Sequence, residues 1–261
     1  MPARVIVSLV LMAIAAGGLT VLAAQVAGLP LALLGLVAAG AALDDASMPS
    51  APDDVSLTEK GLPPSGVGRV LLIACGALAH EILALTRLNA WNHLDLQCLP
   101  ANLHLWPDRI PAAVEKAVLA NRANYADIFV VYADCGTGGI LFEKCKELGV
   151  EMLSGPHCYS FYEGNDAFAA KADDEFTAFY LTDFLARQFD AFVWKPMGLD
   201  RHPELRDMYF GNYTKLIYQA QTNDPVLDAK ARDCAARLGL AYERRFTGYG
   251  DLAPALAALR P

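Results

Sequence analysis

Four side chains that bind soft metal ions follow four apolar runs of the chain. Cys75 and Cys135 come directly after the first and third runs, His104 lies in the loop after the second, and Cys158 lies just beyond the fourth. Because the carboxyl ends of parallel strands meet at one edge of a sheet, we expect these side chains to converge there. A Cys3His set suits tetrahedral zinc, and fewer protein ligands leave a position open for catalysis. The spacing therefore predicts a metal site, with zinc as the expected ion.

The other cysteines have no such placement. The chain holds six cysteines, and Cys98, Cys145 and Cys234 fall inside a predicted strand or helix, where we interpret them as packing residues. His157 is an alternative ligand beside Cys158. A cysteine alone is more often a small buried hydrophobe than a ligand, so packing of all six is the competing interpretation.

Further polar residues near this edge are candidates for catalysis or binding. Glu81 is the sole acidic residue on the first predicted helix. It could bind the metal ion, hydrogen-bond to a metal ligand or act as a general acid, or it could be a solvated surface residue. Tyr132 is a second candidate for proton transfer, and with Tyr159, Tyr162 and Tyr180 it is a candidate to line a pocket. A glycine-rich turn could bind an anion or a cofactor phosphate through its backbone amides, or be a tight turn only. The residues of that turn are Gly136, Thr137, Gly138 and Gly139.

The elements that must position these residues alternate along the chain from Arg69. Short β-branched runs and helical patterns predict an α/β fold, with a mostly parallel sheet flanked by helices, Rossmann-like. The stretch 176–189 is the longest amphipathic one in a segment rich in helix formers. The predicted strands are 70–74, 94–99, 128–132, 150–153, 215–219 and 241–246, and the predicted helices are 79–88, 107–121, 140–148, 225–238 and 252–259.

The N-terminal part belongs to a different physical class. Residues 1–47 are apolar, with no charge between Val5 and Leu43, and four interpretations stay open: a membrane anchor, a hairpin, a cleaved signal, or an untranslated extension before Met48. Residues 48–68 read as a polar linker and residues 69–261 as the α/β domain. We expect a cytoplasmic domain, with anchoring at the inner membrane through residues 5–43 as an option.

Composition excludes two classes of protein. The net charge of -8, without a stripe of Lys and Arg, argues against nucleic-acid binding. Six cysteines in 261 residues are too sparse for a disulfide scaffold and fit a reducing compartment.

Several short motifs together resemble a known family. They are Ala74 to Gly76 followed by Glu81, Leu99-Pro100 with Leu103-His104 and Pro107, Tyr132 with Asp134-Cys135-Gly136, His157-Cys158, and Tyr180-Leu181-Thr182. In order and spacing they are similar to the domain of unknown function 1638 (DUF1638) family, over roughly residues 69–256. The chain departs from the family pattern at His157-Cys158, where many members carry His-Asp-Cys, and at Thr182-Asp183-Phe184.

The resemblance implies an association and a set of residues. Members of the family often accompany corrinoid-dependent methyltransferases of one-carbon and methylamine metabolism, so such an enzyme is an expected partner. The resemblance also singles out Cys75, His104, Cys135 and Cys158.

Two functional hypotheses follow. The first is a zinc-binding protein or metalloenzyme in one-carbon or methyl-group metabolism. The alternative is a non-enzymatic module for a corrinoid or another tetrapyrrole, with His104 or a thiolate as axial ligand. An iron–sulfur cluster is a third cofactor compatible with these side chains. Whether the protein is an enzyme stays open at this point.

Overall fold

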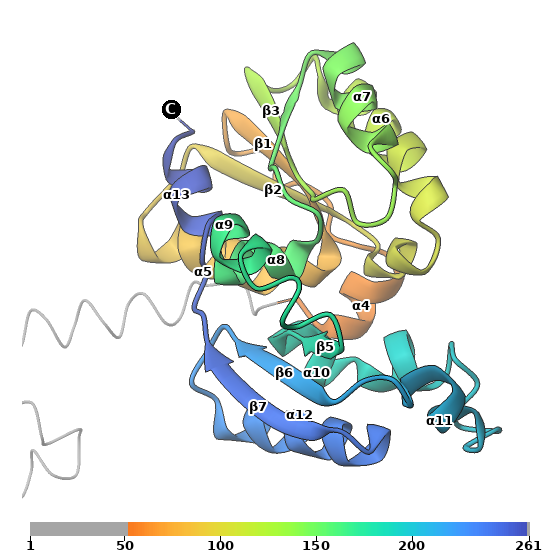
Figure 1. The fold of residues 1–261 in the computed structure, drawn as a ribbon. Helices are drawn as coiled ribbons and strands as arrows, with labels where there is room; N and C mark the ends of the chain where they lie inside the picture. Colours follow the sequence, from red (N-terminus) through yellow and green to blue (C-terminus); the bar gives the residue numbers. More distant parts are fainter. Residues whose placement is uncertain (1–51, 260–261) are drawn as a thin grey trace, which may run out of the picture. The chain divides into compact units, whose positions relative to one another are not determined.

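Strands and helices alternate along the chain in the structure. A computed structural model of the protein describes residues 52–259, and the part from Pro52 onward forms one compact unit (Figure 1). Each strand in this part pairs in parallel with its neighbours. The predicted α/β class, with parallel strands flanked by helices, is therefore confirmed.

The apolar N-terminal segment cannot be compared with its prediction, because residues 1–51 lie outside the described residues. Between residues 52 and 259, no helix combines the length and the apolar character that crossing a membrane requires. Anchoring through residues 5–43 stays a prediction.

The first sheet has four strands in the order β2-β1-β3-β4. This order reverses between β1 and β3, and helices cover both faces: α5 lies on one face, and α6 and α7 lie on the other (Figure 1). The central strand β1 is buried at all 6 positions, as a parallel strand covered on both faces must be. The elements are β1 (Val70–Cys75), β2 (Leu94–Leu99), β3 (Asp127–Val131), β4 (Glu151–Met152), α5 (Ala79–Leu88), α6 (Ile110–Asn121) and α7 (Ile140–Leu148).

The second sheet has three strands in the order β5-β6-β7 and a core of its own. Leu216 and Tyr218 of β6 are fully buried in that core. The parallel strands of the predicted α/β domain thus lie in two sheets. The elements are β5 (Ala178–Leu181), β6 (Lys215–Ala220), β7 (Ala241–Phe246), α10 (Asp183–Arg187), α11 (Leu205–Phe210) and α12 (Pro225–Leu238).

The amphipathic stretch 176–189, which lies in a segment rich in helix formers, contains strand β5 and the short helix α10. Ala178 and Leu181 are buried, and β5 pairs with β6 along its whole length. Thr182 then begins the helix by accepting a hydrogen bond from the Leu185 N–H at 3.3 Å. Two apolar positions three residues apart fit a helix face as well as a short strand, so periodicity alone does not separate the two structures here.

Shorter elements connect and cover the sheets. Helix α13 returns to the first core, where Leu252 and Leu256 are fully buried. The remaining elements are α8 (Cys158–Glu163), α9 (Asn165–Ala169), α13 (Leu252–Ala257), the 3₁₀ turns Gly76–Leu78, Ala101–Leu105 and Pro107–Arg109, and the π-helical turn Asp190–Trp194.

The segment predicted as a linker contains helix α4 (Asp54–Glu59), which belongs to the folded unit. Leu57 of α4 is fully buried in the first core, and Leu62 forms an antiparallel bridge with Cys98. The approach of α4 to the sheet requires glycine at Gly76, where a Cβ atom would lie 2.4 Å from the Leu57 carbonyl oxygen. A polar composition with one buried leucine hides such a helix from sequence analysis.

The burial of Leu57 predicts a large effect of its truncation. Leu57→Ala should lower the free energy of unfolding by about 2–4 kcal/mol, because it leaves a cavity in the first core. Val55→Ala on the same helix, where Val55 is 58% exposed, should change it by less than about 0.5 kcal/mol. Urea denaturation of the full-length chain measures both. Equal effects of the two substitutions would contradict the packing of α4 on the first core.

Candidate metal centre

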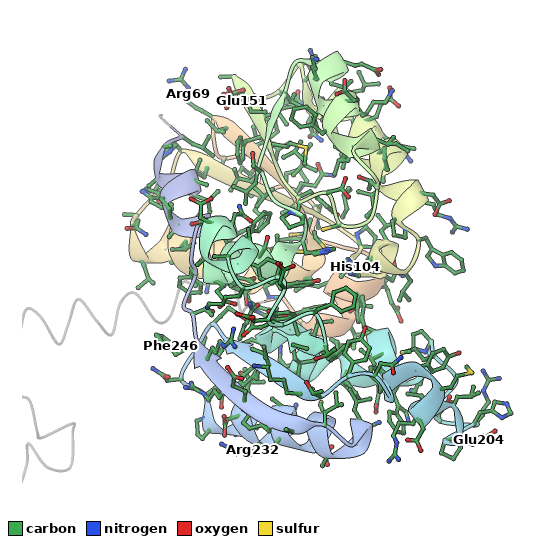
Figure 2. All side chains as sticks on the ribbon, in the orientation of Figure 1. Arg69, His104, Glu151, Glu204, Arg232 and Phe246 are labelled. Carbon is green, nitrogen blue, oxygen red and sulfur yellow. The ribbon has the colours of Figure 1, made fainter. Side chains whose placement is uncertain are left out.

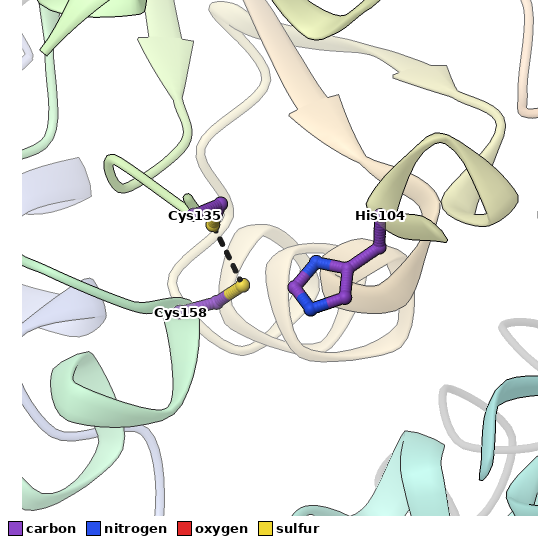
Figure 3. Close-up of side chains that lie close together, drawn as sticks. All are labelled: His104, Cys135 and Cys158. Atoms are coloured by element: carbon purple, nitrogen blue, oxygen red, sulfur yellow. Dashed lines mark hydrogen bonds between the residues drawn. The ribbon is translucent and has the colours of Figure 1, made fainter. Parts of the chain in front are cut away.

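Three of the four predicted ligands converge at the carboxyl end of the first sheet (Figure 3). The side-chain nitrogen of His104 and the sulfur atoms of Cys135 and Cys158 all lie within 4.8 Å of one another. The two sulfur atoms are 3.4 Å apart. These distances bring the three potential ligand atoms within reach of a single ion.

The order of strands explains this convergence. Cys135 follows β3, His104 lies in the 3₁₀ turn after β2, and Cys158 is the first residue of α8, after β4. In a sheet of order β2-β1-β3-β4 the loops after β1 and β3 separate at the point where the order reverses, and such a point is where open α/β sheets bind ligands. Figure 2 places His104 between the first and the second sheet.

Backbone hydrogen bonds hold the two cysteine loops against each other. The Asp134 N–H donates to the Gly155 carbonyl at 3.0 Å, and the Cys135 N–H donates to the Pro156 carbonyl at 3.1 Å. Cys135 adopts a positive φ of 49°, an uncommon conformation for a residue other than glycine. These bonds hold the loop after β3 against Pro156, which precedes Cys158 by two residues in the chain.

The glycine-rich turn after Cys135 is held by the side chain of Asp134. This carboxylate accepts hydrogen bonds from the Thr137 hydroxyl at 2.8 Å, the Gly138 N–H at 3.1 Å and the Gly139 N–H at 2.6 Å. Burial acts to raise the pKa of Asp134, but these hydrogen bonds outweigh it and hold that pKa below its ordinary value. Two of the amides predicted to bind an anion therefore already have an internal acceptor, and binding of a cofactor phosphate stays a prediction.

The pKa values of Cys135 and Cys158 are shifted in opposite directions. The hydrogen bond from the Cys158 thiol lowers the pKa of Cys135 to about 5 against the opposing effect of burial, and His104 lowers it further. The same hydrogen bond, together with burial, raises the pKa of Cys158 well above its ordinary value. The lowered pKa favours the thiolate form of Cys135, which is the form of cysteine that binds metal ions.

Cys75 lies outside the group of three. It ends strand β1 and is 4% exposed, and burial raises the pKa of its thiol to about 12. Burial also lowers the pKa of the alternative ligand His157, whose ring stacks on Tyr159 at a centroid distance of 4.8 Å. Within the part of the chain that the structure describes, neither residue belongs to the converging set.

The two residues predicted to transfer protons are buried. Glu81 is 4% exposed on α5, its Oε2 atom has no hydrogen-bond partner among the described residues, and burial raises its pKa to about 7. Its helical context favoured a solvated side chain, and the structure buries it instead. Tyr132 is 2% exposed and its hydroxyl also lacks a partner there. Their catalytic roles stay predictions.

A small pocket with a volume of about 70 Å³ adjoins two of the three converging residues. His104 and Cys158 form part of its wall. Of the four tyrosines considered as pocket residues, Tyr159 and Tyr162 line it, whereas Tyr132 and Tyr180 do not. The sequence analysis did not assign Phe184, Leu185 or Phe192 to the site, because only the packing of the second sheet on the first brings them there. The other residues that line the pocket are Ala77, Leu78, Ala101 and Thr182.

The ionisation of Cys135 can be tested in the chain after a chelator has removed metal. Ultraviolet thiolate absorbance should show one transition with a midpoint near pH 5, with thiolate present above it and lost as the pH falls through it. Cys135→Ser should abolish the transition, and Cys158→Ala should move its midpoint toward the ordinary thiol value of about 8.5. Cys145→Ser, at a buried cysteine of α7, is the matched control. A midpoint above pH 8 in the unaltered chain would contradict the lowered pKa of Cys135.

Comparison with known proteins agrees with the resemblance. The family model described as a protein of unknown function, DUF1638, matches residues 98–256 of the 261 residues. The matched part contains the three converging residues and leaves Cys75 and Glu81 outside. No curated protein and no solved structure matches the chain.

Proposed function

The chain belongs to the DUF1638 family of proteins of unknown function, and we propose that it binds a zinc ion through His104, Cys135 and Cys158. The observation that carries the proposal is the approach of these three ligand atoms to within 4.8 Å of one another. In a tetrahedral zinc site, sulfur atoms at about 2.3 Å from the ion lie about 3.8 Å apart. The sulfur–sulfur distance of 3.4 Å is close to that spacing, so a small opening of the pair accommodates the ion.

The chemistry of the three side chains favours zinc over harder ions. Thiolate sulfur and imidazole nitrogen suit a borderline-soft ion, whereas magnesium and calcium require oxygen ligands. The lowered pKa of Cys135 favours its thiolate, and binding of the ion would displace the proton that the raised pKa of Cys158 retains. An iron–sulfur cluster usually takes four cysteine ligands, so two converging cysteines support it less well.

Three protein ligands support a metal site that performs chemistry. Structural zinc sites usually have four protein ligands, and catalytic sites keep one position open. A bound zinc ion lowers the pKa of water or of a thiol and polarises oxygen atoms. In this chain the pocket beside His104 and Cys158 provides the space in which a ligand can reach the open position. We therefore favour a metalloenzyme over a purely structural zinc site.

A role in one-carbon or methyl-group metabolism, with a corrinoid-dependent methyltransferase as partner, rests on the resemblance to the family. The alternative of a corrinoid or tetrapyrrole module draws less support from the pocket. Cofactor pockets enclose about 300–1,000 Å³, whereas the pocket at this site encloses about 70 Å³. A small ligand fits this space better than a macrocycle does.

Elemental analysis tests the proposal directly. The full-length chain, purified without chelator or added metal, should carry about one zinc ion and no visible absorption. Cys135→Ser, Cys158→Ser and His104→Ala should each reduce the zinc content to less than about a tenth, because two ligands do not retain the ion.

Cys75→Ser and Cys145→Ser are the controls, and both should keep the zinc. Circular dichroism establishes that every variant is folded. Full zinc content in folded Cys135→Ser would sink the proposal, and loss of zinc in folded Cys75→Ser would show a fourth protein ligand. A coloured protein would direct attention to a corrinoid or an iron–sulfur cluster instead.

A further inference from the structure

We propose that the pocket beside His104 and Cys158 binds a small uncharged thiol, whose sulfur occupies the open position of the metal ion. This inference rests on the proposed function, since a metal ion is what would select sulfur over oxygen. It adds the chemical class of the ligand, which the three converging side chains alone leave undefined.

The position of the pocket puts a bound molecule next to the ligand atoms. His104 and Cys158, two of the three converging residues, form part of its wall. The opposite side comes from the segment after β5, with Phe184 and Phe192 as its largest side chains. A molecule in this space lies beside two of the three residues that would hold the ion.

The volume limits the size of the ligand. The pocket encloses about 70 Å³, which is room for about five water molecules or about five non-hydrogen atoms of a ligand. Nucleotides, peptides and macrocycles exceed this volume several-fold. A two- or three-carbon compound with one metal-binding atom fits.

The residues that line the pocket disfavour a charged ligand. No Asp, Glu, Lys or Arg lines it among the residues that the structure describes, and most of its lining is aliphatic or aromatic. A carboxylate buried there would lose its water without gaining a partner, which is strongly unfavourable. A neutral molecule does not incur this cost.

Thr182 adds one polar contact for a ligand. Its side chain is buried, with an exposed fraction of 8%, and its oxygen accepts a hydrogen bond from the Leu185 N–H. Among the described residues the hydroxyl proton has no recorded acceptor, so it can donate to a ligand oxygen in the pocket. A thiol that also carries a hydroxyl group therefore suits both the ion and the wall.

The donor atom follows from the proposed metal site. Zinc is a borderline-soft ion that binds thiolate sulfur as well as imidazole nitrogen, so the sulfur of a thiol can serve as its fourth ligand. On binding, the thiol releases its S–H proton to solvent and its sulfur donates an electron pair to the ion. No electron is transferred and no further reactant is required.

Cobalt(II) in place of zinc makes the binding visible. In the full-length chain loaded with cobalt, 2-mercaptoethanol should raise the thiolate-to-cobalt charge-transfer absorbance per ion about 1.5-fold, because the number of sulfur ligands rises from two to three. At the same concentration, 1,2-ethanediol should not raise it, because oxygen replaces sulfur. Mercaptoacetate should not raise it either, because its carboxylate remains charged.

A pocket-filling variant distinguishes the pocket from thiol binding elsewhere. Ala77 is half-buried in the pocket wall, so Ala77→Leu should leave the cobalt spectrum intact and abolish the response to 2-mercaptoethanol. Ala113→Leu, at a half-buried alanine of α6 outside the pocket, should keep both the spectrum and the response. The pair separates filling of the pocket from a general effect of a larger side chain.

Each other outcome overturns a defined claim. Three results would overturn the thiol inference and leave the metal site intact. They are a cobalt spectrum unchanged by 2-mercaptoethanol, an equal response to mercaptoacetate, and a response to 2-mercaptoethanol that persists in Ala77→Leu. A folded chain that takes up no cobalt and no zinc overturns the metal site and the thiol inference together.

Discussion

Two hydrogen bonds between neighbouring loops are the constraint on which the site depends. The N–H groups of Asp134 and Cys135 donate to the carbonyls of Gly155 and Pro156, and so the loop after β3 is joined to the loop after β4. Together with the pairing of β3 and β4, this connection holds the sulfur atoms of two cysteines that are 23 residues apart in the chain at a distance of 3.4 Å. The positive φ of Cys135 costs on the order of 1 kcal/mol for a non-glycine residue, and the hydrogen bonds of the turn that follows help to stabilise it.

The buried carboxylate of Asp183, at the start of α10, positions the pocket residues that follow β5. Asp183 accepts hydrogen bonds from the Tyr218 hydroxyl at 2.6 Å, from the Gln221 N–H at 3.1 Å and from the N–H and hydroxyl of Thr222 at 3.0 and 2.7 Å. These bonds satisfy a charge that would otherwise be expensive to bury, and they tie the start of α10 to the loop after β6. The neighbouring Thr182 and Phe184 are thereby held in the pocket wall. The site is in this sense a product of both sheets.

Two buried polar groups stand apart from this well-satisfied network. The Oε2 atom of Glu81 and the Tyr132 hydroxyl have no hydrogen-bond partner among the described residues, and neither residue lines the pocket. Burial without a partner disfavours the charged carboxylate and explains why the pKa of Glu81 is raised to about 7.

The sequence by itself determined the parallel α/β class and the order of most elements, because strand and helix periodicities are local properties. It also placed His104, Cys135 and Cys158 at strand ends, where the geometry of parallel sheets brings side chains together. Only the tertiary structure decided that Cys75 lies outside this group, that Glu81 is buried and that Asp134 occupies the amides of the glycine-rich turn. The division into two sheets and the wall contributed by Phe184 and Phe192 were likewise decided there. The hydrogen bonds of Asp134 are local, within five residues of the chain. The other features depend on contacts between segments far apart in the chain, which a periodicity along the sequence does not indicate.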